Sequence, residues 1–238
     1  MKFHKARIFV VKKFVTNLII IKNQYVRKFF IWHIDCNTTK TRHRMLHNFT
    51  GRRTVIMPRL PAVNPDTATG QAQHLLQGVQ KKLGFAPNIM RTMANAPAVL
   101  QGYLDFSAAL SKGRLSAKFR EKIALIVSEA NSCGYCLAAH SAIGQSVGLS
   151  EEAIRDSRQG ESTDTKEAVA LAFTRNLVTQ RGWATDEEVA KLHRAGFSDG
   201  DIAEVIANIA LTLFTNYFNH VAGTEIDFPV APDLHAHT

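Results

Sequence analysis

The 238-residue chain has only three cysteines, and it has no uninterrupted run of about 18 apolar residues that could span a bilayer. It also has no clean apolar core followed by a small-residue cleavage site, so an export signal is not indicated. Few cysteines and no export signal favour a reducing compartment, and we expect the protein to be cytoplasmic. A hydrophobic content of 45% excludes global disorder.

Acidic residues are almost missing from the first 56 residues, where Asp35 alone stands against 13 Lys and Arg. From Met57 onward the chain has 16 Lys and Arg and 19 Asp and Glu, so a mildly acidic part follows a strongly basic leader. The leader has no serine, which argues against a transit peptide. Its basic residues form no partner-specific pattern, and we expect no nucleic-acid partner. We interpret residues 1–56 as upstream sequence, translated in error, and expect the domain to span residues 57–238.

A chain that begins at Met57 should therefore fold, assemble and retain full activity. Removing the leader takes away a net charge of +12 but no segment that is patterned to join the core. Circular dichroism, light scattering and activity of the long and short chains test this boundary. Loss of folding or assembly in the short chain would contradict it.

Apolar residues at helical spacing, separated by proline, glycine and capping residues, predict an all-α domain. Gly84 and Gly113 should end the first and third helices, and Ser116 should cap the fourth. Strand-like alternation almost never persists. The helices are expected at about 72–83, 88–95, 98–112, 117–131, 134–147, 151–158, 165–181, 186–195 and 199–221, with capping boxes at Thr185 with Glu188 and at Ser198 with Asp201.

The last predicted helix is apolar on two sides, which is typical of a helix in the centre of a core or in a subunit interface. We therefore expect a homo-oligomer. One of its two apolar stripes, the one that begins at Ile202, continues into Asn216, Tyr217 and His220. Asn216 and His220 are candidates for a pocket wall, and a buried hydrogen-bonded cluster is the alternative. The two stripes are Ile202, Val205, Ile206, Ile209 and Leu213, and Leu211, Phe214, Phe218 and Val221.

The segment from Glu121 to His140 holds the residues that indicate chemistry. Asn131, Ser132 and Gly134 interrupt the helical pattern, so Cys133 should lie at a helix start, where free N–H groups and the helix dipole stabilise a thiolate. Cys136 follows one turn later, within disulfide reach. His140 lies one turn beyond Cys136, on the same face.

Glu121 should complete this arrangement. If the chain reverses near residues 131–133, the two flanking helices pack antiparallel and bring Glu121 level with His140. A nucleophile, a base and a carboxylate that orients the base are the three groups that covalent catalysis uses. Glu129 shares a face with Lys122, and we expect it to be solvated or ion-paired.

Two other interpretations of the cysteines remain. Cys133, Cys136, His140 and Glu121 could supply four zinc ligands, although no second Cys/His pair is present to close such a site. The cysteines could also be two buried core residues. Thiol redox chemistry is favoured over both because the helix start and the histidine each stabilise a thiolate. Our interpretation therefore includes no metal and no bound cofactor.

From Met57 to Pro229 the sequence resembles the alkylhydroperoxidase AhpD-like branch of the carboxymuconolactone decarboxylase superfamily, in its peroxidase-related subgroup. The resemblance lies in the E-x11-C-x-x-C-x-x-x-H core, in residues 83–100 (LGFAPNIMRTMANAPAVL) and in residues 223–229 (GTEIDFP). It implies a multihelical fold that forms trimers or hexamers. It further implies that Cys136 is the peroxidatic thiol and Cys133 the resolving thiol, with His140 as base and Glu121 as relay.

The resemblance also implies a function, namely reduction of a peroxide through a Cys133–Cys136 disulfide in antioxidant defence. The reductant would be an external dithiol, and the resemblance suggests one on a lipoyl-bearing protein. One departure is Tyr135, a further pocket candidate, which stands where AhpD has a histidine; a neutral phenol does not shuttle protons as imidazole does.

Two functions of other classes stay open. Lactone decarboxylation is the superfamily's other chemistry, and it does not rely on paired cysteines, so a Cys133→Ser/Cys136→Ser protein should keep that activity. A non-enzymatic redox-sensing role would show no steady-state peroxide turnover.

Overall fold

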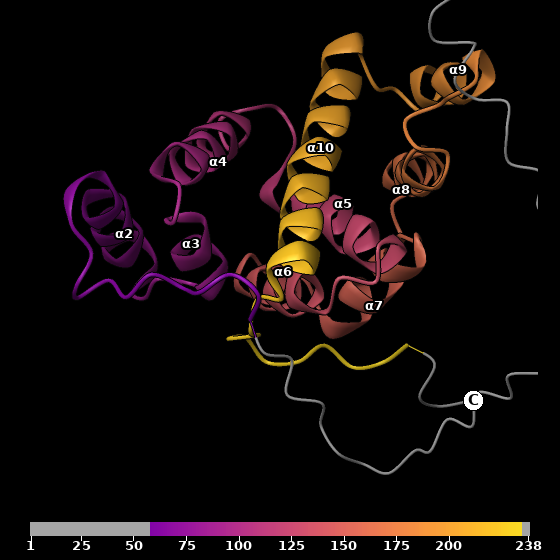
Figure 1. Ribbon diagram of the computed structural model, residues 1–238. Helices are drawn as coiled ribbons and strands as arrows, with labels where there is room; N and C mark the ends of the chain where they lie inside the picture. The colour runs from indigo at the N-terminus through magenta and orange to yellow at the C-terminus, as the bar shows by residue number, and fades with distance from the viewer. Residues whose placement is uncertain (1–57, 235–238) are drawn as a thin grey trace, which may run out of the picture. The chain divides into compact units, whose positions relative to one another are not determined.

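The computed structural model describes residues 58–234, and within this range the chain forms nine α-helices and no strand (Figure 1), which confirms the predicted all-α class. The leader predicted over residues 1–56 lies outside the described residues. The helices are α2 (Gly70–Leu83), α3 (Asn88–Met93), α4 (Pro97–Leu110), α5 (Ala117–Ala130), α6 (Gly134–Ser146), α7 (Glu151–Gln159), α8 (Thr165–Thr179), α9 (Asp186–Arg194) and α10 (Asp199–Ala222).

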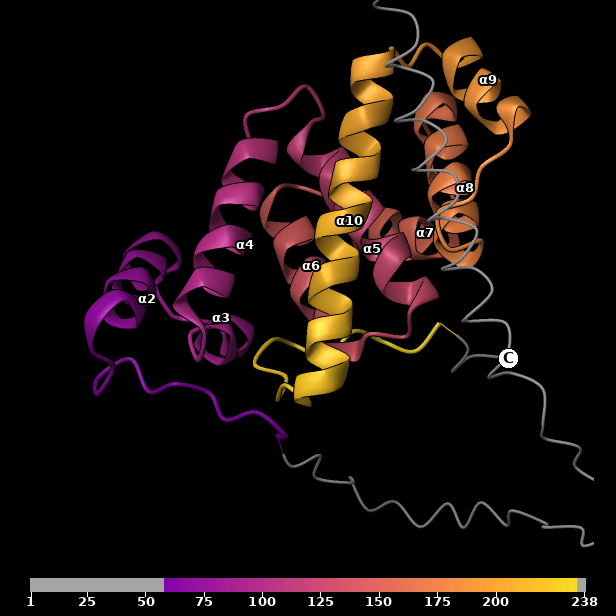
Figure 2. The same ribbon diagram turned by 45° about the horizontal axis from the view of Figure 1, so that its top comes forward.

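Helix α5 lies at the centre of the domain and packs against α6, α7, α8 and α10. Helices α2 to α4 lie on one side of the long α10, and α7 to α9 lie on the other (Figures 1 and 2). One hydrophobic cluster joins α5, α8, α9 and α10. A second cluster joins α2, α3 and α4 to the start of α6 and contains Cys133 and Cys136. Both cysteines therefore lie inside the protein.

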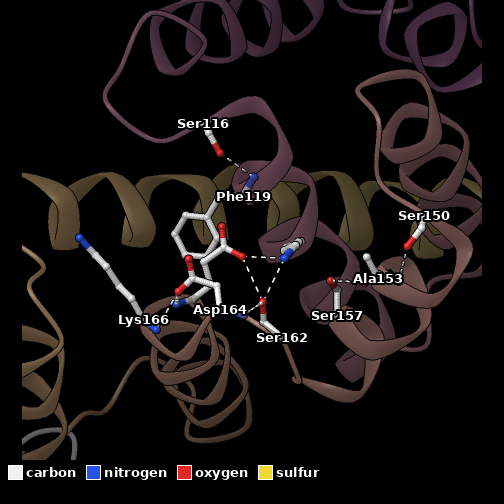
Figure 3. Close-up of polar contacts among 10 residues, drawn as sticks. Ser116, Phe119, Ser150, Ala153, Ser157, Ser162, Asp164 and Lys166 are labelled. Carbon is white, nitrogen blue, oxygen red and sulfur yellow. Dashed lines mark hydrogen bonds and ion pairs between the residues drawn. The ribbon is translucent and has the colours of Figure 1, made fainter.

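Side-chain caps begin five of the nine described helices, and the sequence predicted three of them, at Ser116, Thr185 and Ser198. The Ser116 and Ser150 hydroxyls accept hydrogen bonds from the third backbone N–H of α5 and of α7, each at 3.1 Å (Figure 3). Asp164 caps α8 in the same way, through the Lys166 N–H at 2.8 Å. The capping boxes predicted before α9 and α10 are both present. Local sequence thus determines where each of these helices starts.

The predicted role of Gly113 was wrong. Helix α4 ends earlier, at Leu110, and Gly113 is not in the left-handed conformation of a helix-ending glycine. The Glu204 carboxylate accepts hydrogen bonds from the backbone N–H groups of Arg114 and Leu115 and lies directly over Gly113, where a Cβ would overlap it. A side chain at residue 113 would push the Glu204 carboxylate away from these N–H groups, so glycine lets this contact form.

The two apolar sides of α10 have different surroundings. On the first, Ile202, Val205 and Ile209 are buried in the core, but Ile206, which the pattern assigned to the same stripe, is 46% exposed. On the second, Val221 is 66% exposed in the single chain. In spite of its length, α10 carries enough polar residues that it does not qualify as a membrane-spanning helix, and neither does any other helix within residues 58–234.

We expect this second side to be covered by another copy of the chain. Val221→Asp places a charge at the most exposed apolar residue of this stripe and should weaken self-association at least tenfold, about 1.4 kcal/mol, because an unpaired charge is costly to bury. Light scattering at micromolar concentration checks the result. The control is Gln71→Glu, which adds the same charge on exposed α2. A wild-type protein that is only monomeric under these conditions would contradict the prediction.

Candidate active site

The site is built on the tight turn between α5 and α6. Ser132 takes a left-handed conformation with φ of 54°, and the Cys133 N–H donates a 2.9 Å hydrogen bond to the Ser128 carbonyl, which closes the end of α5. Cys133 is then the N-cap residue of α6, and Gly134 is its first residue. The chain reverses here as the sequence predicted, so α5 and α6 lie side by side.

This reversal brings Glu121 and His140 together. The Glu121 Oε2 and His140 Nδ1 atoms are 2.7 Å apart, although the two residues are 19 positions apart in the sequence. Burial alone would lower the pKa of His140, but the charge and hydrogen bond of Glu121 outweigh burial and raise it. The carboxylate therefore favours a positively charged imidazole and leaves Nε2 available to face other groups.

The two thiols differ in acidity although both are buried. Cys133 donates a hydrogen bond to the Cys136 sulfur, and this is the largest influence on the pKa of Cys136, which falls to about 6 although burial opposes the change. The positive charge of His140 and the Asn219 amide add to the effect. The same hydrogen bond and burial raise the pKa of Cys133. Cys136 is the thiolate of the pair.

Cys136 also faces a cavity of about 340 Å³, which Cys133 does not line. The cavity lies between α6, the α2–α4 side and the segment after α10. Its walls are largely apolar and aromatic, and His140 lies next to Cys136 in the wall. A small organic molecule can therefore reach the acidic thiol and its histidine together. The aromatic residues of the wall are Phe85, Tyr103, Tyr135 and Phe228.

Of the three pocket candidates, the structure places only Tyr135 at the cavity. Its hydroxyl accepts a hydrogen bond from the Ile89 N–H at 3.2 Å, so it holds the start of α3 in the wall. Asn216 is fully buried, where it accepts from the Asn131 amide at 2.9 Å and donates to Ser128 at 3.4 Å. It belongs to the buried polar cluster that was the alternative and does not line the cavity, but its side chain, like that of Asn219, lowers the pKa of Cys136 by hydrogen bonding.

His220 was placed wrongly, because its side chain is exposed and does not line the cavity. The helical register of α10 instead turns Thr215 and Asn219 toward the site. The Asn219 Nδ2 lies 3.2 Å from the Cys136 sulfur and the Thr215 hydroxyl 3.9 Å from it. Sequence reasoning missed both, although a polar stripe on this apolar helix could have indicated them: Asn208, Thr212, Thr215, Asn216 and Asn219.

The geometry of the described residues does not favour the zinc alternative. Among residues 58–234 no three His, Cys, Asp or Glu side chains lie close enough together to hold a metal ion. Glu129, the competing carboxylate, is ion-paired as expected, since its Oε2 lies 2.7 Å from the Nε of buried Arg158. The carboxylate that reaches the histidine is Glu121.

Residues 97–176 match the model of the carboxymuconolactone decarboxylase family. This range begins with α4 and ends within the last turn of α8. This match includes Glu121, both cysteines and His140. This part of the chain, about a third of its length, is therefore similar to that family. No curated protein matches it in sequence.

Solved structures share the fold of this chain at low sequence identity. They include an uncharacterized peroxidase-related protein from Ralstonia eutropha, with a TM-score of 0.65, 23% identity and coverage of 71% of this chain and 92% of that one. A second uncharacterized peroxidase-related protein, from Silicibacter sp., has a TM-score of 0.64, 23% identity and coverage of 74% and 94%. The debrominase Bmp8 in complex with 2,3,4-tribromopyrrole has a TM-score of 0.61, 23% identity and coverage of 73% and 92%. At these identities the likeness shows the fold.

The position of Asn219 leads to a prediction about the acidity of Cys136. Asn219→Ala removes an amide donor from the Cys136 sulfur, so the pKa of Cys136 should rise, by about one unit if the bond contributes about 1.5 kcal/mol. Thiolate absorbance measured against pH checks the shift. Asn208→Ala is the matched control, because Asn208 lies on the same helix and its amide donates to the Glu204 carbonyl, not to sulfur. The same pKa of Cys136 in Asn219→Ala and Asn208→Ala would contradict a role for Asn219.

Proposed function

We propose that this protein is a thiol-dependent hydroperoxide reductase that uses Cys136 as its peroxidatic thiol. The observation that carries the proposal is the position of the acidic Cys136: it faces an apolar cavity, with His140 and Glu121 behind it. A thiolate is the reactive form of cysteine, and a base held by a carboxylate keeps it deprotonated.

The cycle balances with these residues alone and an external dithiol. His140 takes the Cys136 proton, and the thiolate attacks the terminal oxygen of a hydroperoxide, so the O–O bond breaks and an alcohol leaves. Cys136 becomes a sulfenic acid. The Cys133 thiol, already hydrogen-bonded to Cys136, attacks that sulfur, releases water and forms a disulfide. The dithiol then reduces the disulfide by exchange.

The walls of the cavity favour an organic hydroperoxide over hydrogen peroxide. Burying an alkyl or aryl group against apolar surface stabilises the bound substrate by about 25 cal/mol per Å². Cumene hydroperoxide should therefore have a lower KM than hydrogen peroxide.

The deciding experiment is steady-state hydroperoxide consumption with a panel of dithiols that includes dihydrolipoamide. Repeated turnover with one of them supports the proposal. Oxidation that stops after one equivalent, with every donor, would indicate a redox sensor. An activity on a lactone that survives in Cys133→Ser/Cys136→Ser would indicate the family's decarboxylase chemistry.

A second candidate is reductive dehalogenation of a small aromatic compound, favoured by the aromatic wall of the cavity and by the fold shared with a debrominase. Two thiols supply the two electrons that replace carbon–bromine by carbon–hydrogen, and bromide is released as the disulfide forms. Bromide release from a brominated pyrrole, absent in Cys136→Ser, is the measurement that separates this activity from peroxide reduction.

A further inference from the structure

Breaking the O–O bond of an alkyl hydroperoxide leaves a strongly basic alkoxide, which needs a proton inside the apolar cavity. Most hydroxyl groups in the wall are already engaged. The Ser146 hydroxyl donates to the Ile143 carbonyl at 2.7 Å, and the Thr215 hydroxyl donates to the Thr212 carbonyl at 2.9 Å. The Tyr135 hydroxyl accepts from the Ile89 N–H and is also hydrogen-bonded to Asp227. These three groups hold the wall in place and are not free to serve the substrate.

Tyr103 on α4 is different. Across residues 58–234, no hydrogen bond engages its hydroxyl, and its ring is held beside Phe214, with centroids 6.4 Å apart. Tyr103 lines the main cavity with Cys136 and His140. It also lines a neighbouring cavity of about 170 Å³ that contains Glu121 and the other side of His140. The phenol thus belongs to the wall between the reacting thiol and the Glu121–His140 pair.

The phenol also keeps its proton. Burial, followed by the negative charges of Cys136 and Glu121, raises the pKa of Tyr103 to about 12. An alkoxide is a stronger base than this phenolate, so proton transfer from Tyr103 to an alkoxide is downhill. A carboxylate, in contrast, is a far weaker base and would not take this proton.

We propose that Tyr103 is a catalytic residue that donates its phenolic proton to the leaving oxygen of the hydroperoxide. This inference rests on the proposed reductase function. The Cys136 sulfur forms a bond to the terminal oxygen, the O–O bond breaks, and its electron pair goes to the oxygen that carries the organic group. That oxygen takes the Tyr103 proton and leaves as an alcohol. The phenolate then recovers the proton that His140 removed from Cys136.

A leaving-group series tests the assignment in the full chain. Tyr103→Phe keeps the ring and removes only the donor. It should lower kcat/KM for cumene hydroperoxide about a hundredfold, at the lower end of general acid catalysis. For peroxybenzoic acid, whose leaving group is a carboxylate that needs no proton, the loss should be far smaller. Tyr217→Phe, the same change at a residue that is 59% exposed on α10, is the control and should match wild type.

A merely structural role for Tyr103 would reduce the rates with both substrates by the same factor, and that result would overturn the inference. An unchanged rate with cumene hydroperoxide would overturn it as well. A wild-type protein that consumes neither peroxide would overturn the proposed function and this inference with it, so the two failures are distinguishable.

Discussion

Cys136→Ser should abolish peroxide consumption. Serine keeps the shape of the side chain, but its hydroxyl does not ionise near neutral pH, whereas the pKa of Cys136 is lowered to about 6. Without this thiolate no other thiol of residues 58–234 faces the cavity, because Cys133 does not line it. Consumption of cumene hydroperoxide should fall to the rate of the solution without enzyme.

Cys133→Ser should behave differently. Its Cys136 should still be oxidised once, and the sulfenic acid should persist because no neighbouring thiol can condense with it. Dimedone should trap this species, and mass spectrometry should locate the adduct on Cys136. The serine hydroxyl also replaces a donor that lowers the pKa of Cys136, so the single oxidation can be slower than in wild type. An adduct found on Cys133 of a Cys136→Ser protein, with none on Cys136, would reverse the assignment.

His140→Phe should lower kcat/KM for cumene hydroperoxide by about a hundredfold to ten-thousandfold, the range of general acid–base catalysis. It removes both the base and the positive charge that helps to lower the pKa of Cys136. Glu121→Gln should cost less, because it acts through His140: without the carboxylate at 2.7 Å the imidazole binds its proton less tightly. In both variants the pKa of Cys136 should rise.

The pH dependence follows from these shifts. In wild type the rate should be steady above about pH 6 and fall as Cys136 is protonated below it. In Glu121→Gln this acid limb should move to higher pH. Glu129→Gln is the control: it weakens the ion pair with buried Arg158 and costs stability, but it should leave the Cys136 titration unchanged. If the pKa of Cys136 is unchanged in Glu121→Gln but raised in Glu129→Gln, then Glu129 and not Glu121 is the carboxylate that supports His140.

Several features of the site could be predicted from sequence because they depend on residues close together in the chain. The caps at Ser116 and before α9 and α10 are local hydrogen bonds. The break before Gly134 is local as well, and once two helices reverse there, their regular rise fixes which residues come level. For this reason Glu121 and His140 could be paired without a structure.

The order of acidity of the two cysteines could not be decided in this way. The helix dipole favoured Cys133, the N-cap residue of α6, while the nearby His140 favoured Cys136. The structure adds a hydrogen bond between the thiols in which Cys133 is the donor, so Cys133 keeps its proton and Cys136 loses one. The direction of that bond depends on what else surrounds each sulfur, including the amide of Asn219 on α10.

The sequence alone therefore determined the all-helical class, the position of the thiols at a helix start, and their alignment with a histidine and a carboxylate. These depend on spacing along one helix or across one turn. Only the tertiary structure decided that Asn219 and not His220 faces the sulfur, that Glu204 approaches Gly113, and that Tyr103 lines the cavity. Each of these features joins segments far apart in the sequence, and the rotation of one packed helix against another is set by the side chains of both.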